Sequence, residues 1–379
     1  MAEYLRIENF GPIVEAELDD IRPFCVLIGE SGSGKSTIMK VLSLFRWIYK
    51  RVNLRSYLKL AKIKRTQLGF KIKPLMRTSG IYEYLKADSV IEYHRDGYII
   101  KMENRSVNIR FTITPDDLCL DKVCFISDKR AMIPDFIDNK MERRIANYYL
   151  QDTMDNFVMA YKRSRQLSID FLGVDFKVEK PKNGAERLTI QGAEAEEFSI
   201  EMKNASSGIQ TVTPLAMIVN HYATHYDAEE SMNTALFQYM KDTDMLKQFS
   251  AVKNVGEIRR RTVHVMVEEP ELSLYPESQT QLIDFLVERS FGQPQRDYSM
   301  TLMMATHSPY IVNYLNLLIQ RAERGEETPY KMAYEDISAY EVSGGCTTSL
   351  KVDESKLIDT RPLSQPISDI YEEYNQNAQ

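Results

Sequence analysis

The fold of this chain is decided by the stretch Gly29-Glu30-Ser31-Gly32-Ser33-Gly34-Lys35-Ser36-Thr37. It fits the phosphate-binding pattern G-x-x-x-x-G-K-[ST] at every fixed position. The apolar residues 24–28 before it predict a buried strand, and the pattern over residues 37–48 predicts a helix. Because strand, glycine-rich loop and helix follow in this order, we expect backbone N–H groups and the helix N-terminus to hold a phosphate.

The whole stretch from Gly29 to Thr37 is therefore our candidate nucleotide-binding loop. Within it, we expect Lys35 to reach the β- and γ-phosphates of ATP and to take part in catalysis. The Ser36 hydroxyl should face Mg²⁺. The alternative, a chance glycine-rich turn, leaves the strand before the loop and the helix after it unexplained.

The composition is that of an ordinary globular protein, with 379 residues of which 43% are hydrophobic and 27% charged. The net charge of −6 argues against nonspecific nucleic-acid binding by the surface as a whole. No apolar run is long enough to span a membrane and the N-terminus lacks signal-peptide features, so we predict a cytoplasmic protein. The cysteines have no metal-ligand spacing and are expected to be reduced, mostly buried thiols: Cys25, Cys119, Cys124 and Cys346.

The apolar residues 263–267 predict a second core strand. The strand is followed by the acidic run Glu268-Glu269-Pro270-Glu271. This is the pattern of a Walker B strand. We expect Glu268 to orient Mg²⁺, and, being one methylene longer than the usual Asp, it can do so through water. Glu269 is the candidate base that polarises a water for attack on the γ-phosphate. The alternative is a solvated acidic turn.

A further strand pattern over residues 301–305 leads into Thr306-His307-Ser308-Pro309. A histidine at the carboxyl edge of a core strand can sense the γ-phosphate through a ring nitrogen, so His307 is a candidate catalytic residue. We expect the other histidines to be ordinary core or surface residues: His94, His221, His225 and His264.

The segment Ser206-Ser207-Gly208-Ile209-Gln210 opens a predicted helix over residues 207–226. Ser206 or Ser207 is a good N-cap, and a helix start of this kind can also bind an anion. A simply capped helix is the alternative.

Together these motifs resemble the ABC-type ATPase head of the RecF, SMC and OLD-like branch. Ser206-Ser207-Gly208-Ile209-Gln210 is similar to the L-S-G-G-Q signature, with Leu and the second Gly replaced. Residues 268–276 are similar to the E-E-P-E-x-x-L-x-P pattern of OLD-like and phage-defence ATPases, residues 305–309 match their switch motif, and residues 5–12 look like their opening strand and turn. The resemblance implies an α/β P-loop NTPase with a mixed central sheet, an antiparallel β subdomain and an inserted helical lobe.

The resemblance also implies that residues 1–379 form a single ATPase head made up of several lobes. We expect a core lobe from residues 1–45, 81–130 and 255–379, a basic helical insert at 46–77, and a helical signature lobe at 131–254. Residues 127–130 are a candidate for the Q-loop region. The stretch after residue 320 is too short for a TOPRIM nuclease domain, so we expect an ATPase without its own nuclease.

The mechanism that the resemblance implies is the hydrolysis of ATP to ADP and phosphate in a head-to-tail homodimer or higher homo-oligomer. Each ATP lies between the phosphate loop of one copy and Ser206, Ser207, Gly208 and Gln210 of the other. Glu269 acts as base and His307 as γ-phosphate sensor, and Ser273 crosses the interface. Such a switch senses nucleic acid or an invader and controls a separate nuclease or toxin in antiviral defence. The alternatives are a RecF-like repair or recombination ATPase and a slow-turnover scaffold that cages an effector; a transporter subunit is disfavoured by the altered signature.

The block at residues 46–77 is unusually basic, and no acidic residue occurs between Glu30 and Glu83. Its cations and interleaved aromatic residues predict contact with DNA or RNA. Two alternatives stay open, a docking surface for an acidic partner and the solvated face of an amphipathic helix. The cations are Arg46, Lys50, Arg51, Arg55, Lys59, Lys62, Lys64, Arg65, Lys71, Lys73 and Arg77.

Overall fold

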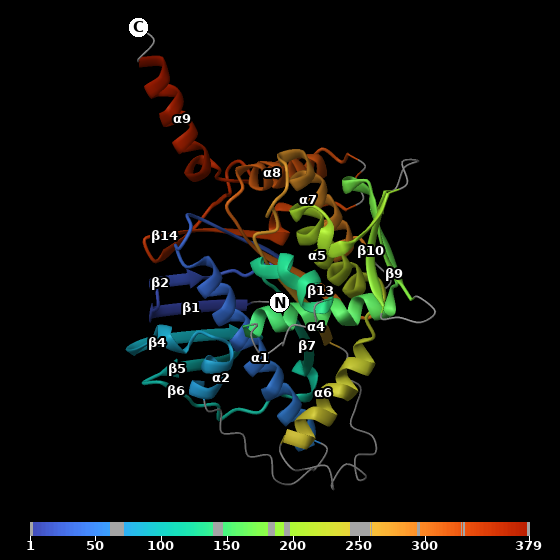
Figure 1. The fold of residues 1–379 in the computed structure, drawn as a ribbon. Helices are drawn as coiled ribbons and strands as arrows, with labels where there is room; N and C mark the ends of the chain where they lie inside the picture. Colours follow the sequence, from blue (N-terminus) through green and yellow to red (C-terminus); the bar gives the residue numbers. More distant parts are fainter. Residues whose placement is uncertain are drawn as a thin grey trace.

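The computed structural model describes residues 3–60, 72–138, 147–180, 186–192, 198–242, 258, 260–293, 296–326, 328 and 330–376. Within these ranges the centre of the molecule is a mixed sheet of 11 strands (Figure 1). In sheet order the strands are β6 (Ser106–Val107), β5 (Tyr98–Glu103), β4 (Leu85–Arg95), β1 (Glu3–Phe10), β2 (Ile13–Leu18), β15 (Cys346–Ser349), β14 (Ile337–Ser343), β3 (Phe24–Ile28), β13 (Ser299–Thr306), β12 (Arg260–Glu268) and β7 (Cys119–Ile126).

One half of this sheet is parallel and buried on both faces. β14, β3, β13, β12 and β7 run in the same direction, and all five residues of β3 are buried. Continuous apolar runs are typical of strands covered on both sides. Because the strands are parallel, their carboxyl ends meet at one edge, which is where a ligand binds in open α/β sheets.

The other half, β6 to β2, is antiparallel and shows the alternation of buried and more exposed residues that a sheet with one covered face requires. The predicted antiparallel β subdomain is thus continuous with the central sheet through the pairing of β2 with β15. The mixed α/β fold class is confirmed.

The helices pack on both faces of the sheet. Alternate residues of β3 point into opposite cores: Phe24, Val26 and Ile28 into one, Cys25 and Leu27 into the other. The first core is completed by α4, α5, α7 and α8, and the second by α1, α2 and α6. The helices are α1 (Lys35–Leu60), α2 (Ile72–Thr78), α3 (Ile133–Asp138), α4 (Tyr148–Arg163), α5 (Ser207–Thr224), α6 (Ala228–Asp242), α7 (Pro276–Phe291), α8 (Pro309–Glu323) and α9 (Arg361–Gln376).

A second, antiparallel sheet lies beside α4 and α5 (Figure 1). It consists of β8 (Gln166–Ile169), β9 (Val174–Glu179), β10 (Arg187–Gly192) and β11 (Ser199–Glu201), and a two-stranded ribbon is formed by β16 (Lys351–Val352) and β17 (Leu357–Ile358). β9 and β10 pair antiparallel, and residues 181–185 between them lie outside the described residues.

The predicted basic insert at 46–77 requires a correction. Its first part is not an insert, because α1 continues without a break from the phosphate loop to Leu60. Arg46 is 1% exposed and donates to both carboxylate oxygens of Glu3, at 2.8 and 2.6 Å, and Arg55 donates to the carbonyl oxygen of Phe111. Burial alone would raise the pKa of Glu3, but Arg46 brings it down to about 2.

Lys59, Lys73 and Arg77 of the block are exposed, but Arg46 and Arg55 are buried and cannot contact nucleic acid. The reason is that their partners come from distant parts of the chain and cannot be inferred from local charge. The cations of the block that lie outside the described residues are Lys62, Lys64, Arg65 and Lys71.

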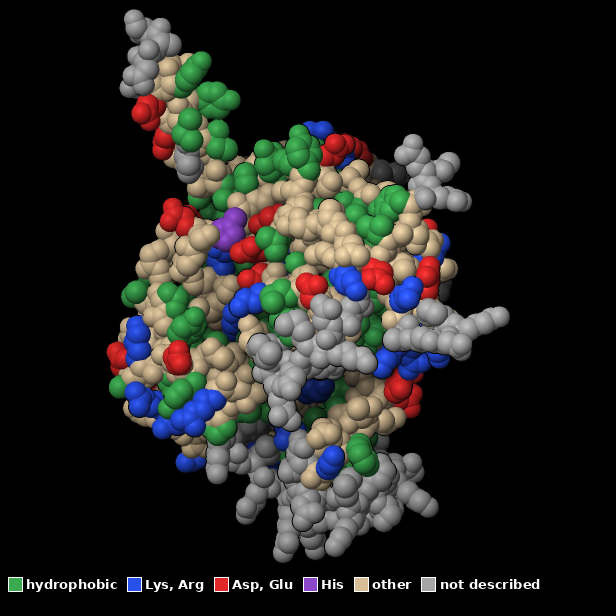
Figure 2. Space-filling model, viewed as in Figure 1, with side chains coloured by type: hydrophobic (Ala, Val, Ile, Leu, Met, Phe, Trp, Pro, Cys, Tyr) green, Lys and Arg blue, Asp and Glu red, His purple; other side chains and the backbone are tan. Residues whose placement is uncertain are grey.

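The helix α9 projects from the body of the molecule (Figure 1) and carries hydrophobic side chains along its length (Figure 2). Ile367, Ile370, Tyr371 and Tyr374 recur at helical spacing and are 49 to 72% exposed. Among the described helices, none is both long and apolar enough to cross a membrane.

Candidate nucleotide-binding site

The phosphate loop follows β3 at the carboxyl edge of the parallel strands. Its backbone conformation requires glycine at two positions, because Gly29 has φ 149° and Gly34 has φ 113°. A Cβ at Gly29 would come within 2.2 Å of the Val342 carbonyl oxygen, and one at Gly34 within 2.4 Å of Ile13 Cδ1. The glycines therefore allow both the curl of the loop and its close packing against neighbouring strands.

The side chain of Lys35 lies across this loop. Its Nζ donates to the carbonyl oxygens of Gly29 and Glu30, at 2.7 and 2.8 Å. Burial lowers the pKa of Lys35 to about 8, although the nearby carboxylates Glu269 and Glu271 act in the opposite direction. Because α1 begins at Lys35, the N–H groups of the helix N-terminus lie close to the Lys35 ammonium group. Such an arrangement is suited to binding an anion.

The first acid of the Walker B run, Glu268, is the last residue of β12 and is only 3% exposed. Burial raises its pKa, while Lys40, with Nζ 3.5 Å from Glu268 Oε1, and a hydrogen bond with the Ser36 hydroxyl act against this rise. A hydroxyl and a carboxylate side by side fit Mg²⁺, which usually takes few protein oxygens and completes its shell with water and substrate phosphates.

The second acid, Glu269, and the switch histidine lie opposite each other at the ends of adjacent parallel strands. Nε2 of His307 is 3.7 Å from Oε1 of Glu269, and both side chains are about one-third exposed, at 31 and 38%. Glu269 has φ 45°, an uncommon value for a residue with a side chain. Strain of this kind occurs where the surrounding structure fixes a functional side chain.

These groups line one cavity of about 230 Å³. It brings together most of the predicted site residues: Ser31, Gly32, Gly34, Lys35, Ser36, Thr37, Glu268, Glu269 and His307. Glu30, Ser31, Gly32 and Ser33 line an adjoining hollow of about 240 Å³ on the side of the β14–β15 turn. Segments that are far apart in the sequence, from the phosphate loop to His307, thus meet at a single edge of the sheet.

Glu271 also contributes to this edge of the sheet, although no motif in the sequence predicts a role for it. Its Oε1 accepts hydrogen bonds from the Thr306 hydroxyl at 2.9 Å and from the His307 backbone N–H at 2.7 Å. Glu271 therefore fixes the backbone that carries the switch histidine. The signal available in the sequence was the third acid of the E-E-P-E run.

Arg130 lies in the candidate Q-loop region and joins the parts of the site. It is fully buried and donates to backbone carbonyl oxygens of Glu268 at 2.7 Å, Glu269 at 2.6 Å and Thr211 at 3.1 Å. It also bonds the carbonyl oxygen of Ser127 at the end of β7. One guanidinium thus connects the Walker B edge with the helix α5; burial lowers its pKa to about 10.

Replacing this guanidinium, in Arg130→Met, should destabilise the fold and slow hydrolysis. The substitution keeps a long side chain but leaves several buried carbonyl oxygens without a donor, which costs about 3 kcal/mol or more. Chemical denaturation and steady-state phosphate release measure the two effects. Arg110→Met, which removes an exposed arginine outside the site, is the matched control and should behave as the parent. A parental free energy of unfolding for Arg130→Met would contradict this account.

The signature segment lies at the start of α5, away from this cavity. Ser206 and Ser207 are exposed, and no residue of 206–210 is among the described residues that line the cavity. A Cβ on Gly208 would come within 2.9 Å of the Ser273 carbonyl oxygen, so the segment packs against the turn after Walker B. The Gln210 amide is turned back, donating to the carbonyl oxygens of Lys203 and Ala205.

The fold and site define a P-loop ATPase with an ABC-type arrangement of motifs. Residues 82–312 match the family model described as "AAA ATPase domain", a match that begins after the phosphate loop and includes the Walker B run and His307. The chain therefore belongs to the AAA ATPase domain family, which indicates an ATPase. This family implies the use of nucleotide and, as a rule, of Mg²⁺.

Solved structures similar to this chain include SMC head domains. The SMC head domain from Thermotoga maritima matches with a TM-score of 0.36 and 10% identity, over 93% of this chain and 100% of that one. An Smc head domain with an extended coiled coil bound to the C-terminal domain of ScpA, from Pyrococcus furiosus, matches with a TM-score of 0.33 and 11% identity, over 98% of each chain. No curated protein matches the sequence.

Proposed function

We propose that this protein is an ATP-driven switch whose hydrolytic site is completed by a second copy of the chain. The observation that carries the proposal is the separation of two sets of residues. The nucleotide cavity contains the phosphate loop, the two Walker B acids and His307, whereas the exposed Ser206 and Ser207 begin a helix elsewhere on the same chain. An exposed helix N-terminus suits the γ-phosphate of a neighbouring protomer.

In this proposal each group of the cavity has a defined task. Lys35 and the loop N–H groups hold the β- and γ-phosphates, and Ser36 and Glu268 hold Mg²⁺, which when bound neutralises charge on the phosphates. Glu269 accepts a proton from the attacking water, and His307 donates to the γ-phosphate. Glu271 keeps the His307 backbone in place through the bonds described above.

The signature lobe, for which we propose residues 131–254, supplies Ser206, Ser207, Gly208 and Gln210 to the nucleotide of the partner. Because the γ-phosphate is then contacted from both sides, ATP favours a closed dimer and hydrolysis opens it. The hydrogen bond from Arg130 to the Thr211 carbonyl oxygen supports a mechanical link between the signature helix and the Walker B edge.

The variant Ser207→Arg tests this arrangement. It should abolish ATP hydrolysis, because a bulky side chain at the start of α5 blocks the neighbour's nucleotide, while ATP binding by the monomer stays at the parental level. Phosphate release and calorimetry measure the two properties. Ser199→Arg, exposed on the same lobe, is the control and should keep parental hydrolysis. Full hydrolysis by Ser207→Arg would refute the action in trans.

We further propose that the switch controls a separate effector protein, in antiviral defence. The exposed hydrophobic residues of α9 support a protein partner, because monomeric proteins rarely leave such a stripe uncovered. Nucleic acid as the trigger stays an alternative, since Lys59, Lys73 and Arg77 of the basic block are exposed whereas Arg46 and Arg55 are buried. Co-expression with the genomic neighbours of the gene, followed by purification, tests this proposal: the complex should form with the full chain and fail with a chain that ends at Thr360.

A further inference from the structure

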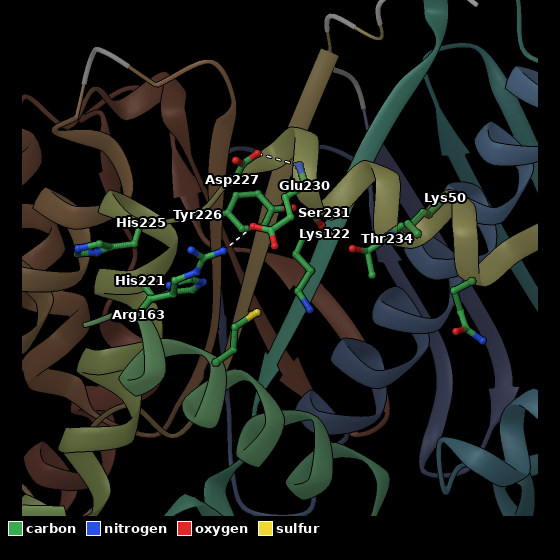
Figure 3. A pocket seen from close by; sticks show the side chains of 13 residues that line it. Lys50, Lys122, Arg163, His221, His225, Tyr226, Asp227, Glu230, Ser231 and Thr234 are labelled. Carbon is green, nitrogen blue, oxygen red and sulfur yellow. Dashed lines mark hydrogen bonds and ion pairs between the residues drawn. The ribbon is translucent and has the colours of Figure 1, made fainter. Parts of the chain in front are cut away.

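A second cavity lies apart from the nucleotide site, between α4, α5 and α6, with α1 and β7 behind it (Figure 3). Its volume is about 460 Å³, against about 230 Å³ for the cavity at the phosphate loop. Among the side chains that line it are Lys50, Lys122, Arg163, His221, Tyr226 and Glu230. The cavity is therefore large enough for a small organic molecule.

Two ammonium groups face this space, from different elements. Lys50 comes from α1 and Lys122 from β7, and Figure 3 shows Lys122 between Lys50 on one side and His221 with Arg163 on the other. Within the described residues, neither lysine has a carboxylate at ion-pair distance. The nearest acids on β7 and α4 are bound elsewhere: Asp121 pairs with Arg95 and Asp152 accepts the Phe125 N–H.

The positive charges of Lys50 and Lys122 also favour a bound anion. Burial lowers the pKa of Lys50 to about 8, and the positive charge of Lys122 adds to this effect. Two cations that repel each other in a partly desolvated space are stabilised when an anion lies between them.

His221 is a second, independent observation that points to a ligand. It is 3% exposed and lines the cavity, yet neither ring nitrogen has a hydrogen-bond partner among the described residues. Burial lowers the pKa of His221 to about 4, so at neutral pH the ring offers one donor and one acceptor. A buried polar group without a partner needs an explanation, and a bound molecule provides one.

The acids at the mouth of the cavity do not neutralise the lysines. Glu230 pairs with Arg163 at 2.5 Å, and the Asp227 carboxylate accepts the Glu230 backbone N–H at 2.8 Å, so both are already bound. Tyr226 adds an aromatic face, with its ring centroid 6.5 Å from that of His221. Lys122 Nζ lies 5.8 Å from the centroid of the Tyr222 ring. The cavity thus combines positive charge that has no carboxylate partner among the described residues with an aromatic and imidazole wall.

We propose that this cavity binds a small phosphate-bearing molecule, with the phosphate between Lys50 and Lys122 and the organic part against His221 and Tyr226. The site is well placed to influence the ATPase. The helix α1 carries Lys35 at its start and Lys50 further along, and α5 carries Ser207 at its start and His221 near its end. The binding itself does not depend on the proposed hydrolytic function.

The test uses the full chain with Lys35→Ala, which removes the phosphate-loop lysine and so isolates the second site. Isothermal titration calorimetry with AMP, glucose 6-phosphate and inorganic phosphate, and with adenosine and glucose as uncharged controls, measures binding. We expect the phosphorylated probes to bind and the uncharged ones not to bind. Binding of all three assigns a general phosphate site, whereas binding of AMP alone restricts the ligand class to nucleotides.

A second substitution in the same background locates the binding. Lys122→Met and, separately, Lys50→Met should each weaken it by about tenfold or more, the loss expected for a charge-assisted contact. Lys129→Met, an exposed cation that follows the same strand, should leave it unchanged. The proposal is overturned if no phosphorylated probe binds, or if both cavity variants, folded as judged by circular dichroism, bind as tightly as the Lys129→Met control.

Discussion

Glu269→Gln should lower the turnover number for ATP about 10²- to 10⁴-fold, the range that a general base contributes. The substitution keeps the shape of the side chain and removes its ability to accept a proton. Because Glu269 lies beside His307, and the phosphate loop with Lys35 is left unchanged, ATP binding should persist. Because the bound ATP is not hydrolysed, the variant should accumulate as a closed dimer.

Phosphate release measures the turnover number, and size-exclusion chromatography with light scattering measures the dimer with and without ATP. The matched control is Glu277→Gln, an exposed carboxylate in the first turn of α7, which should hydrolyse ATP as the parent does. Parental turnover by Glu269→Gln would remove this residue from the role of base.

Lys35→Ala should weaken ATP binding about 100-fold or more, the combined effect of losing charge-assisted hydrogen bonds to two phosphates. In the structure the Lys35 ammonium bonds the carbonyl oxygens of Gly29 and Glu30, so the group is already held where the phosphates enter. The same loss should abolish hydrolysis.

Calorimetry with ATP and Mg²⁺ measures this affinity. Lys86→Ala, at an exposed position on β4, is the control for the loss of one positive charge. Unchanged ATP affinity in a folded Lys35→Ala protein would count against the phosphate loop as the nucleotide site.

The parts of the site that could be predicted are those encoded by local patterns. The phosphate loop is one contiguous motif, and the Walker B acids and His307 each follow a recognisable apolar strand. Parallel strands bring such ends together, so the cavity could be predicted without knowledge of the contacts. The strands β3, β12 and β13 and the helices α1 and α5 follow from the same periodicities.

The parts that could not be predicted depend on contacts between distant residues. Arg130 donates to main-chain oxygens up to 140 residues away, and no local sequence pattern predicts such partners. Arg46 was assigned to a basic surface, but its partner Glu3 is 43 residues distant and the pair is buried in the core. The sequence around His221 predicts an ordinary residue, because only the fold shows that it lines a cavity together with Lys50 and Lys122.

The central claim is that one copy holds ATP while another completes its site, and mixing two inactive variants tests it most directly. Lys35→Ala has a defective phosphate loop and Ser207→Arg a defective signature, so a mixed dimer keeps one intact pocket. An equimolar mixture should recover about one quarter of the parental rate, because half of the dimers are mixed and each has one of two pockets. A mixture that stays inactive, although both variants fold and form dimers, would contradict this account.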